Sequence, residues 1–238
     1  MDMQAITYEF GGKSFTGYLA DGSRGKPTAG VLVAHEGGGM TGHPRQRAQM
    51  LAELGYVAFA MDTFGYPIES REQAMATITG LMGDLPTLQG RARAALEVLR
   101  AQPDVDAART AAIGFCFGGT TVLELARSGA DVPCVIGFHS GLGTSTPAAK
   151  GAIKGKVMVC LGSDDPIISA ADREAFVGEM SAAGADWQMM LLGGVGHSFT
   201  NREVDAMGLP GFRYDETADH RTWRAMRGLL DDALGPVG

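Results

Sequence analysis

The sequence has few cysteines, no excess of positive charge and no long hydrophobic segment. Its three cysteines are widely spaced, which argues against a disulfide framework or a zinc site. The formal net charge of −7 argues against a surface for nucleic acid or for an anionic membrane. No apolar run reaches the roughly 18 residues of a membrane span, and residues 1–4 lack the charged and then apolar pattern of a signal peptide. We therefore expect a soluble, reduced, cytoplasmic protein with no nucleic-acid or membrane partner.

What the chain does contain is glycine and apolar side chains. Its 35 glycines are about twice the usual share, which suits a fold with many tight turns between strands and helices. Apolar residues make up 45% of the 238 positions, enough for a large buried core. Chains of this length commonly form one α/β unit, and no repeat, low-complexity segment or linker interrupts this one. We expect a single domain over residues 1–238.

Short apolar runs alternate with helical patterns along the chain. Residues 6–10 and 15–19 predict an opening hairpin, and the continuous apolar run at 30–34 is typical of a central strand with helices over both faces. Further strands are predicted at 57–62, 110–113, 134–138, 157–161 and 187–192. Helices are predicted at 44–54, 88–100, 120–127, 170–183 and 219–234. This order predicts an α/β fold with a mostly parallel central sheet and helices on both faces.

The most informative segment is residues 114–119, which read Gly-Phe-Cys-Phe-Gly-Gly. Cys116 lies between a predicted strand and a predicted helix. That is the layout of a G-x-S-x-G nucleophile elbow with sulfur in place of oxygen. Glycine tolerates the strained backbone and the close strand–helix approach that such an elbow needs. Taken alone, the segment also fits a buried core cysteine.

A nucleophile needs a base, and the base needs an orienting acid. In hydrolases with this elbow, the acid and then the histidine follow the nucleophile along the chain. Asp164 and Asp165 follow the predicted strand 157–161, and His197 follows the strand 187–192. Both turns therefore lie at the carboxyl ends of strands, where open α/β sheets build their sites. A loop histidine and an aspartate that caps a helix are ordinary features singly, but their shared order and position favour a catalytic triad.

The Gly-rich loop after the first central strand admits two interpretations. Residues 37–42 satisfy the G-x-G-x-x-G dinucleotide fingerprint, with Asp62 about 20 residues later, and this would indicate an NAD(P)-dependent oxidoreductase. Two points count against that interpretation. Glu36 would place a negative charge beside the pyrophosphate, and the predicted helix begins beyond Gly42, so this glycine cannot serve close helix packing.

The same loop is better explained as half of an oxyanion hole. Acyl transfer develops negative charge on the carbonyl oxygen, and preorganised backbone N–H groups stabilise it. One donor is expected to be the amide of Phe117, directly after the nucleophile, and the other the amide of Gly37.

These motifs together resemble the dienelactone hydrolase family of α/β-hydrolases. The matching pieces are His-Glu-Gly-Gly-Gly at 35–39, the Cys116 elbow, Gly-Ser-Asp-Asp-Pro at 162–166 and Gly-His-Ser-Phe at 196–199. The likeness covers roughly residues 5–235 and implies an α/β-hydrolase fold. It also implies that Cys116 is the nucleophile, His197 the base and Asp165 the orienting acid. Asp165 is preferred to Asp164 because the aspartate of the family falls three residues after the glycine.

The resemblance also implies roles around the triad. In the family, a glutamate at the position of Glu36 contacts the resting cysteine and takes part in activating it; a loop carboxylate that caps backbone amides is the structural alternative. The family's substrate class, a small carboxylated lactone, calls for cationic residues, and Arg71 and Arg202 are candidates. The family's arginine, however, lies four residues after the histidine, where this chain has Asn201.

Two further residues, Tyr66 and His139, follow predicted strands and are candidates to line the substrate pocket. The leading hypothesis is a hydrolase of small carboxylic esters or lactones that needs no metal or organic cofactor. The alternatives are the NAD(P)-dependent oxidoreductase and a non-catalytic binding protein with the α/β-hydrolase fold. We expect a monomer or a weak homo-oligomer.

Overall fold

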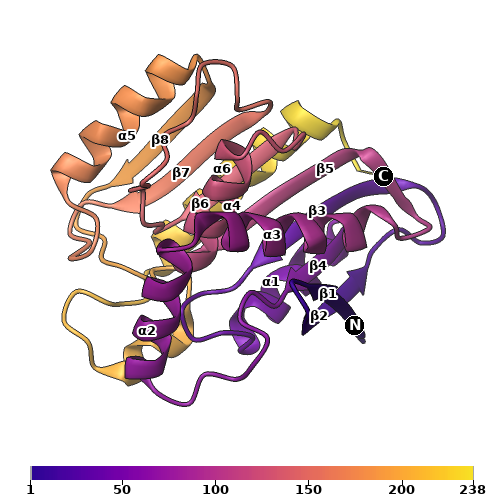
Figure 1. Cartoon of the computed structure of the whole chain (residues 1–238), viewed down its shortest axis with the longest axis horizontal. Coiled ribbons are helices and arrows are strands. Elements are labelled where there is room, and N and C mark those ends of the chain that lie inside the picture. Colours follow the sequence, from indigo (N-terminus) through magenta and orange to yellow (C-terminus); the bar gives the residue numbers. More distant parts are fainter. Residues whose placement is uncertain (1, 238) are drawn as a thin grey trace.

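Eight strands form one sheet in the computed structural model of the chain, which describes residues 2–237 (Figure 1). The sheet order is β1-β2-β4-β3-β5-β6-β7-β8. The strands are β1 (Gln4–Phe10), β2 (Lys13–Asp21), β3 (Thr28–Ala34), β4 (Val57–Met61), β5 (Val105–Phe115), β6 (Cys134–Phe138), β7 (Lys156–Gly162) and β8 (Asp186–Leu192). Only the pairs β1–β2 and β2–β4 are antiparallel.

Helices cover both faces of this sheet. They are α1 (Gly42–Glu53), α2 (Arg71–Met82), α3 (Leu85–Arg100), α4 (Phe117–Arg127), α5 (Ala170–Ala183) and α6 (Glu216–Leu234), with a 3-10 helix η1 at Arg202–Met207. Apolar side chains of α3, α4 and α5 pack on one face and those of α1 and α6 on the other. The predicted α/β architecture, a mostly parallel sheet between two helical layers, is confirmed.

Two elements were not predicted, and several elements begin earlier than expected: β5 at Val105 rather than 110, and α3, α4 and α6 each three residues before their predicted start. Helix α2 and the 3-10 helix η1 lie in segments that show no clear apolar period, and only Ala74 and Leu81 of α2 are buried. Helix α1 begins at Gly42 rather than beyond it. Gly42 therefore does not argue against a dinucleotide fingerprint. The strand order does, because it differs from the 3-2-1-4-5-6 order of the dinucleotide-binding fold.

The parallel strands bring the predicted site residues to one edge. The loops after β3, β5, β7 and β8 all leave the sheet at the carboxyl ends of their strands, so residues far apart in the sequence meet there. The two other cysteines, Cys134 and Cys160, lie inside β6 and β7, and burial raises the pKa of each thiol to about 12. Across residues 2–237, none of the helices combines the length and the apolar character that a membrane span requires.

Candidate active site

The turn between β5 and α4 holds Cys116 in a strained conformation. Its φ is 51° and its ψ is −117°, values that a non-glycine residue rarely adopts. The neighbouring glycines allow this turn. A Cβ on Gly114 would lie 2.1 Å from the carbonyl oxygen of Gly118, and a Cβ on Gly118 would lie 2.2 Å from that of Ala34. The turn thus needs glycine for close approach, and it lifts the cysteine clear of the strand end.

His197 lies between the sulfur and a carboxylate. Its Nε2 is 3.2 Å from Cys116 Sγ, and its Nδ1 is 2.7 Å from Asp165 Oδ2. The other oxygen, Asp165 Oδ1, accepts hydrogen bonds from the amides of Ile167 and Ile168 at 2.8 and 3.2 Å. His197 and Asp165 are both buried. The three side chains are therefore joined in a row by hydrogen bonds.

Asp164, the other candidate acid, takes no part in this row. It is exposed, and its Oδ1 accepts a hydrogen bond of 2.7 Å from Ser163 Oγ. The structure thus places the second of the two adjacent aspartates, Asp165, against the histidine.

The surroundings of His197 favour its protonated form. Burial acts to lower the pKa of His197, but the neighbouring Cys116 sulfur and the Asp165 carboxylate outweigh burial and raise that pKa to about 10. The proton of this imidazole therefore lies within hydrogen-bonding distance of the sulfur on one side, and the ring bonds to a carboxylate on the other.

The two backbone amides predicted for an oxyanion hole belong to different elements. Phe117 is the first residue of α4, so no intrahelical carbonyl can accept from its N–H group. Gly37 lies in the turn after β3. His35 holds this turn: its Nε2 accepts from the amide of Thr63 at 2.9 Å, which leaves Nδ1 to donate to the carbonyl of Glu36 at 2.7 Å. The loop is thus anchored to the segment after β4.

Comparisons with known proteins agree with this geometry. The model of the dienelactone hydrolase family matches residues 15–234. The chain belongs to the dienelactone hydrolase family. A solved structure of a dienelactone hydrolase-like promiscuous phosphotriesterase from metagenomic libraries is 39% identical, with a TM-score of 0.94 over 98% of this chain and 99% of that one. The structure named m3DLH is 43% identical, also with a TM-score of 0.94, over 98% of each chain.

A Caenorhabditis elegans protein, the uncharacterised K02A2.1, is 34% identical over 152 residues, which are 62% of this chain and 94% of that protein. The predicted family and the predicted α/β-hydrolase fold are thereby confirmed. Membership of a hydrolase family also argues against the oxidoreductase that the 37–42 fingerprint suggested.

Glu36, the residue that the family likeness links to activation, makes no hydrogen bond to Cys116 within residues 2–237. Its Oε2 accepts a hydrogen bond from Asn201 Nδ2 and lies 3.7 Å from His43 Nδ1. Within residues 2–237, its Oε1 is buried and has no hydrogen-bond partner. Burial raises the pKa of Glu36, and burial lowers the pKa of His43 to about 3, so this is no ordinary ion pair. Asn201 offers an uncharged amide at the position of the family's arginine.

His139 lies behind the site rather than along its edge. The sequence predicts it as a candidate for substrate contact, but its exposed fraction is 0%. Its Nδ1 accepts a hydrogen bond of 3.1 Å from the amide of Cys116, its Nε2 lies 2.8 Å from Thr200 Oγ1, and its ring packs edge-on against that of His197. This imidazole therefore supports the backbone of the elbow and the ring of His197 instead of facing a ligand.

The other candidates for substrate contact lie apart from the triad residues. Arg202 is exposed, pairs with Glu216 at 3.1 Å and stacks over the ring of Tyr214. Arg71 is exposed at the first position of α2. The hydroxyl of Tyr66 lies 2.8 Å from Thr77 Oγ1. No hydrogen bond joins Arg71, Arg202 or Tyr66 to the triad within the described part of the chain, residues 2–237.

Cys116 packs against an apolar cluster that the sequence analysis missed. The other members of this cluster come from the segment after β4, from α2 and from the starts of α3 and α4: Phe64, Ile68, Ile78, Leu81, Met82, Leu85, Leu88 and Phe117. Helix α2 reaches the turn after β3 here, since a Cβ on Gly37 would lie 2.9 Å from Ile78 Cδ1. The four-residue spacing of Ile78 and Met82 was the available signal, but it is too short to predict a helix.

Proposed function

We propose that this chain is a cysteine hydrolase of carboxylic esters or lactones. In this proposal Cys116 Sγ attacks the carbonyl carbon, and the electron pair of the carbonyl bond moves to oxygen. The amides of Gly37 and Phe117 stabilise the resulting oxyanion. When the intermediate collapses, the bond to the leaving alkoxide breaks, and His197 supplies the proton from Nε2. A thioester remains on Cys116.

Hydrolysis of the thioester completes the cycle. His197, now neutral, removes a proton from water, and the hydroxide oxygen attacks the thioester carbonyl. The carbon–sulfur bond then breaks, which releases the carboxylic acid product and the Cys116 thiolate, while the proton taken from water remains on His197. Asp165 holds the ring with Nδ1 protonated throughout. The observation that carries the proposal is the position of His197, 3.2 Å from Cys116 Sγ and 2.7 Å from Asp165 Oδ2.

The deciding experiment compares hydrolysis of a small activated ester by the wild type and by Cys116→Ala, matched for folding by circular dichroism. We expect activity to be lost in the variant only. Equal rates in the two proteins would refute Cys116 as the nucleophile.

Labelling with iodoacetamide separates a hydrolase from a catalytically silent binding protein. Cys134 and Cys160 are fully buried internal controls, whereas Cys116 is partly exposed. We expect Cys116 to be alkylated at least about tenfold faster in the native protein, because thiolate character controls reactivity. Labelling of Cys116 as slow as that of Cys134 would favour the binding protein.

We further propose that the preferred substrate is uncharged. The sulfur lies in an apolar cluster, and the position of the family's arginine carries the neutral Asn201, whose amide is bonded to Glu36. A substrate carboxylate would find no cation there. The test compares an uncharged aryl acetate with the matching, negatively charged aryl hemisuccinate. We expect the wild type to have the higher kcat/KM for the acetate. Asn201→Arg should reduce the ratio of the two kcat/KM values. Asn201→Gln is the matched control, and an equal effect of both substitutions would contradict the proposal.

Phosphotriester hydrolysis is a second candidate activity. It is favoured by the likeness to the promiscuous phosphotriesterase, which extends over nearly the whole of both chains. A phosphotriester is also uncharged, and its phosphoryl oxygen could accept from the same two amides. We expect slow release of a phenol from an aryl dialkyl phosphate by the wild type, and none by Cys116→Ala. Turnover that survives in Cys116→Ala would assign it to another group.

A further inference from the structure

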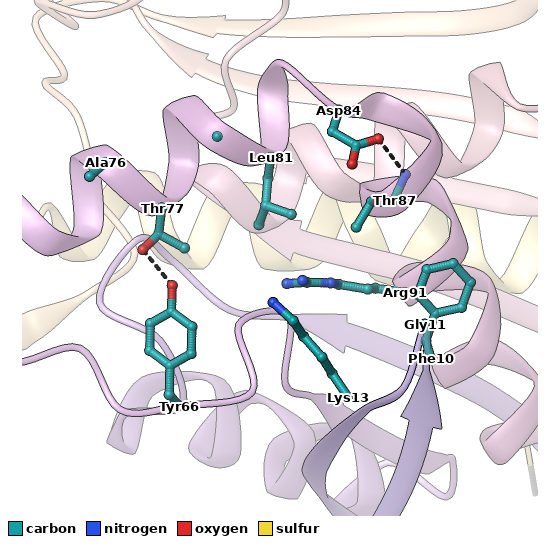
Figure 2. Close-up of a pocket in the computed structure, with 11 residues that line it drawn as sticks. Phe10, Gly11, Lys13, Tyr66, Ala76, Thr77, Leu81, Asp84, Thr87 and Arg91 are labelled. Atoms are coloured by element: carbon teal, nitrogen blue, oxygen red, sulfur yellow. Dashed lines mark hydrogen bonds between the residues drawn. The ribbon is translucent and has the colours of Figure 1, made fainter.

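A pocket that none of the proposed catalytic residues lines lies beside α2. It has a volume of about 390 Å³ and is lined by α2, the start of α3, Tyr66 and the tip of the β1–β2 hairpin (Figure 2). Its walls include the apolar side chains of Phe10 and Leu81, and Tyr66 and Thr77 close one end through their hydrogen bond. The volume suits a small organic molecule. No residue of the proposed triad or oxyanion hole lines it.

Arg91 of α3 contributes a buried positive charge to this pocket. Its side chain is only 7% exposed, and its guanidinium lies 5.0 Å from the ring centre of Phe15. Nη1 donates to the carbonyl of Thr63 at 2.7 Å, but Nε is buried with no partner among residues 2–237. No carboxylate of that described range pairs with Arg91 within 4.0 Å. Burial also lowers the pKa of Arg91, because the more distant carboxylates Asp62 and Asp84, which act to raise this pKa, do not outweigh the loss of hydration.

Lys13, at the start of β2, brings a second cation to the same space. Figure 2 shows its amino group extending toward the guanidinium of Arg91, between Tyr66 and Leu81. Two like charges that converge repel each other, and an anion between them removes this cost. The one carboxylate in the lining, Asp84, is occupied elsewhere, since its Oδ1 accepts from the amide of Thr87 at 3.2 Å and caps α3.

We propose that this pocket binds a small organic anion, with its carboxylate or phosphate group between Lys13 and Arg91 and its apolar part against Phe10 and Leu81. A guanidinium in a fixed orientation suits either oxyanion, because it presents several N–H donors in one plane. Leu81 also belongs to the apolar cluster against which Cys116 packs, but none of the residues proposed for catalysis lines this pocket. The proposal therefore does not depend on the hydrolase proposal.

The test is calorimetric titration of Cys116→Ala at low ionic strength, once with inorganic phosphate and once with succinate. Cys116→Ala removes turnover at the proposed catalytic site from the measurement. We expect one binding site per chain for at least one of the two anions, and the tighter of the two identifies the chemistry of the group. Adding Lys13→Glu should weaken binding at least about tenfold, because it replaces one of the two cations by a negative charge.

Two controls make the result decisive. Arg93→Gln removes an exposed cation from the same helix, one that bonds to Ser128 and does not line the pocket, and it should leave binding unchanged. Arg91→Met keeps the length of the side chain; if it is folded by circular dichroism, it should also lose binding. In an otherwise wild-type chain, Lys13→Glu should leave ester hydrolysis unaltered. Absence of binding for both anions at millimolar concentration, or equal binding by Lys13→Glu and Arg93→Gln, would overturn the proposal.

Discussion

The strained backbone at Cys116 can be measured as a stability difference between two variants that both lack the sulfur. Cys116→Ala and Cys116→Gly both lack the sulfur, so the hydrogen bond to His197 is lost in each. They differ only in the Cβ atom, which is the source of the steric cost at a φ of 51°. The glycine variant should therefore be the more stable of the two, although glycine is normally the less stable choice.

The magnitude follows from two opposing terms. A non-glycine residue in a sparsely populated backbone region costs about 1–3 kcal/mol. Glycine costs about 0.5–1 kcal/mol relative to alanine through the entropy of the unfolded chain. The net advantage of Cys116→Gly is thus about 1 kcal/mol. In a chain of this size, that corresponds to a Tm higher by about 2–4 °C.

A matched position controls for the place of Cys116 at the start of a helix. Thr41 is the N-cap residue of α1, and Cys116 is the N-cap residue of α4. Neither side chain makes a capping hydrogen bond, but the φ of Thr41 is −83°, an ordinary value for a non-glycine residue. Urea unfolding of all four glycine and alanine variants gives two differences. We expect the difference at position 116 to favour glycine by about 1–3 kcal/mol more than at position 41. Differences that agree within about 0.5 kcal/mol would refute the strain argument.

Three further predictions concern the triad and the core. Asp165→Asn should lower kcat for the ester substrate by about 10⁴-fold, because Nδ1 of His197 loses its acceptor; a loss under tenfold would contradict the assignment. Folding raises the pKa of His197 from 6.5 to about 10, so the protonated ring stabilises the folded state fully below pH 6.5, and this contribution is lost as the pH rises through 10. The free energy of unfolding, measured with urea between pH 6.5 and 10, should therefore fall in the wild type by an amount that is absent in His197→Gln. Arg127→Leu leaves the fully buried Glu124 without its 2.9 Å ion-pair partner, and it should lower the free energy of unfolding in urea by about 3–5 kcal/mol. Adding Glu124→Leu removes the unpaired charge, so the double variant should recover part of that loss.

The parts of the site that follow strands were predictable from the sequence. Cys116, Asp165 and His197 each come directly after a short apolar run, and parallel strands necessarily bring such turns to one edge. The glycines at 114 and 118 mark the elbow because only glycine fits there sterically. The choice between Asp164 and Asp165 rested on the family likeness, and the hydrogen bond to His197 agrees with it.

Helix α2 and the pocket beside it were not predictable in the same way. Only Ala74 and Leu81 of α2 are buried, so its apolar period is weak, and its partly buried Ile78 and Met82 pack on side chains from the segment after β4 and from α3. Arg91 lies in a helix whose apolar stripe was recognised, and an arginine beside such a stripe normally reaches solvent. Its burial arises from the β1–β2 hairpin, about 80 residues earlier in the chain, which covers it. No local pattern carries that information.

The polar side chains behind the elbow show why stability and chemistry share residues here. Arg47 of α1 pairs with Asp219 of α6 at 2.8 Å and also donates to the carbonyl of Thr200. The hydroxyl of Thr200 bonds to His139, and His139 in turn accepts from the amide of Cys116. Burying polar groups is costly unless they are hydrogen-bonded, and here a continuous series of bonds links two helices on one face of the sheet to Cys116. A change at Arg47 would therefore leave Asp219 as a buried, unpaired charge and would also loosen the support of Cys116. The strained backbone of Cys116 is held in place because His139 and Thr200, which support it, cannot move without breaking hydrogen bonds of the buried Arg47–Asp219 pair.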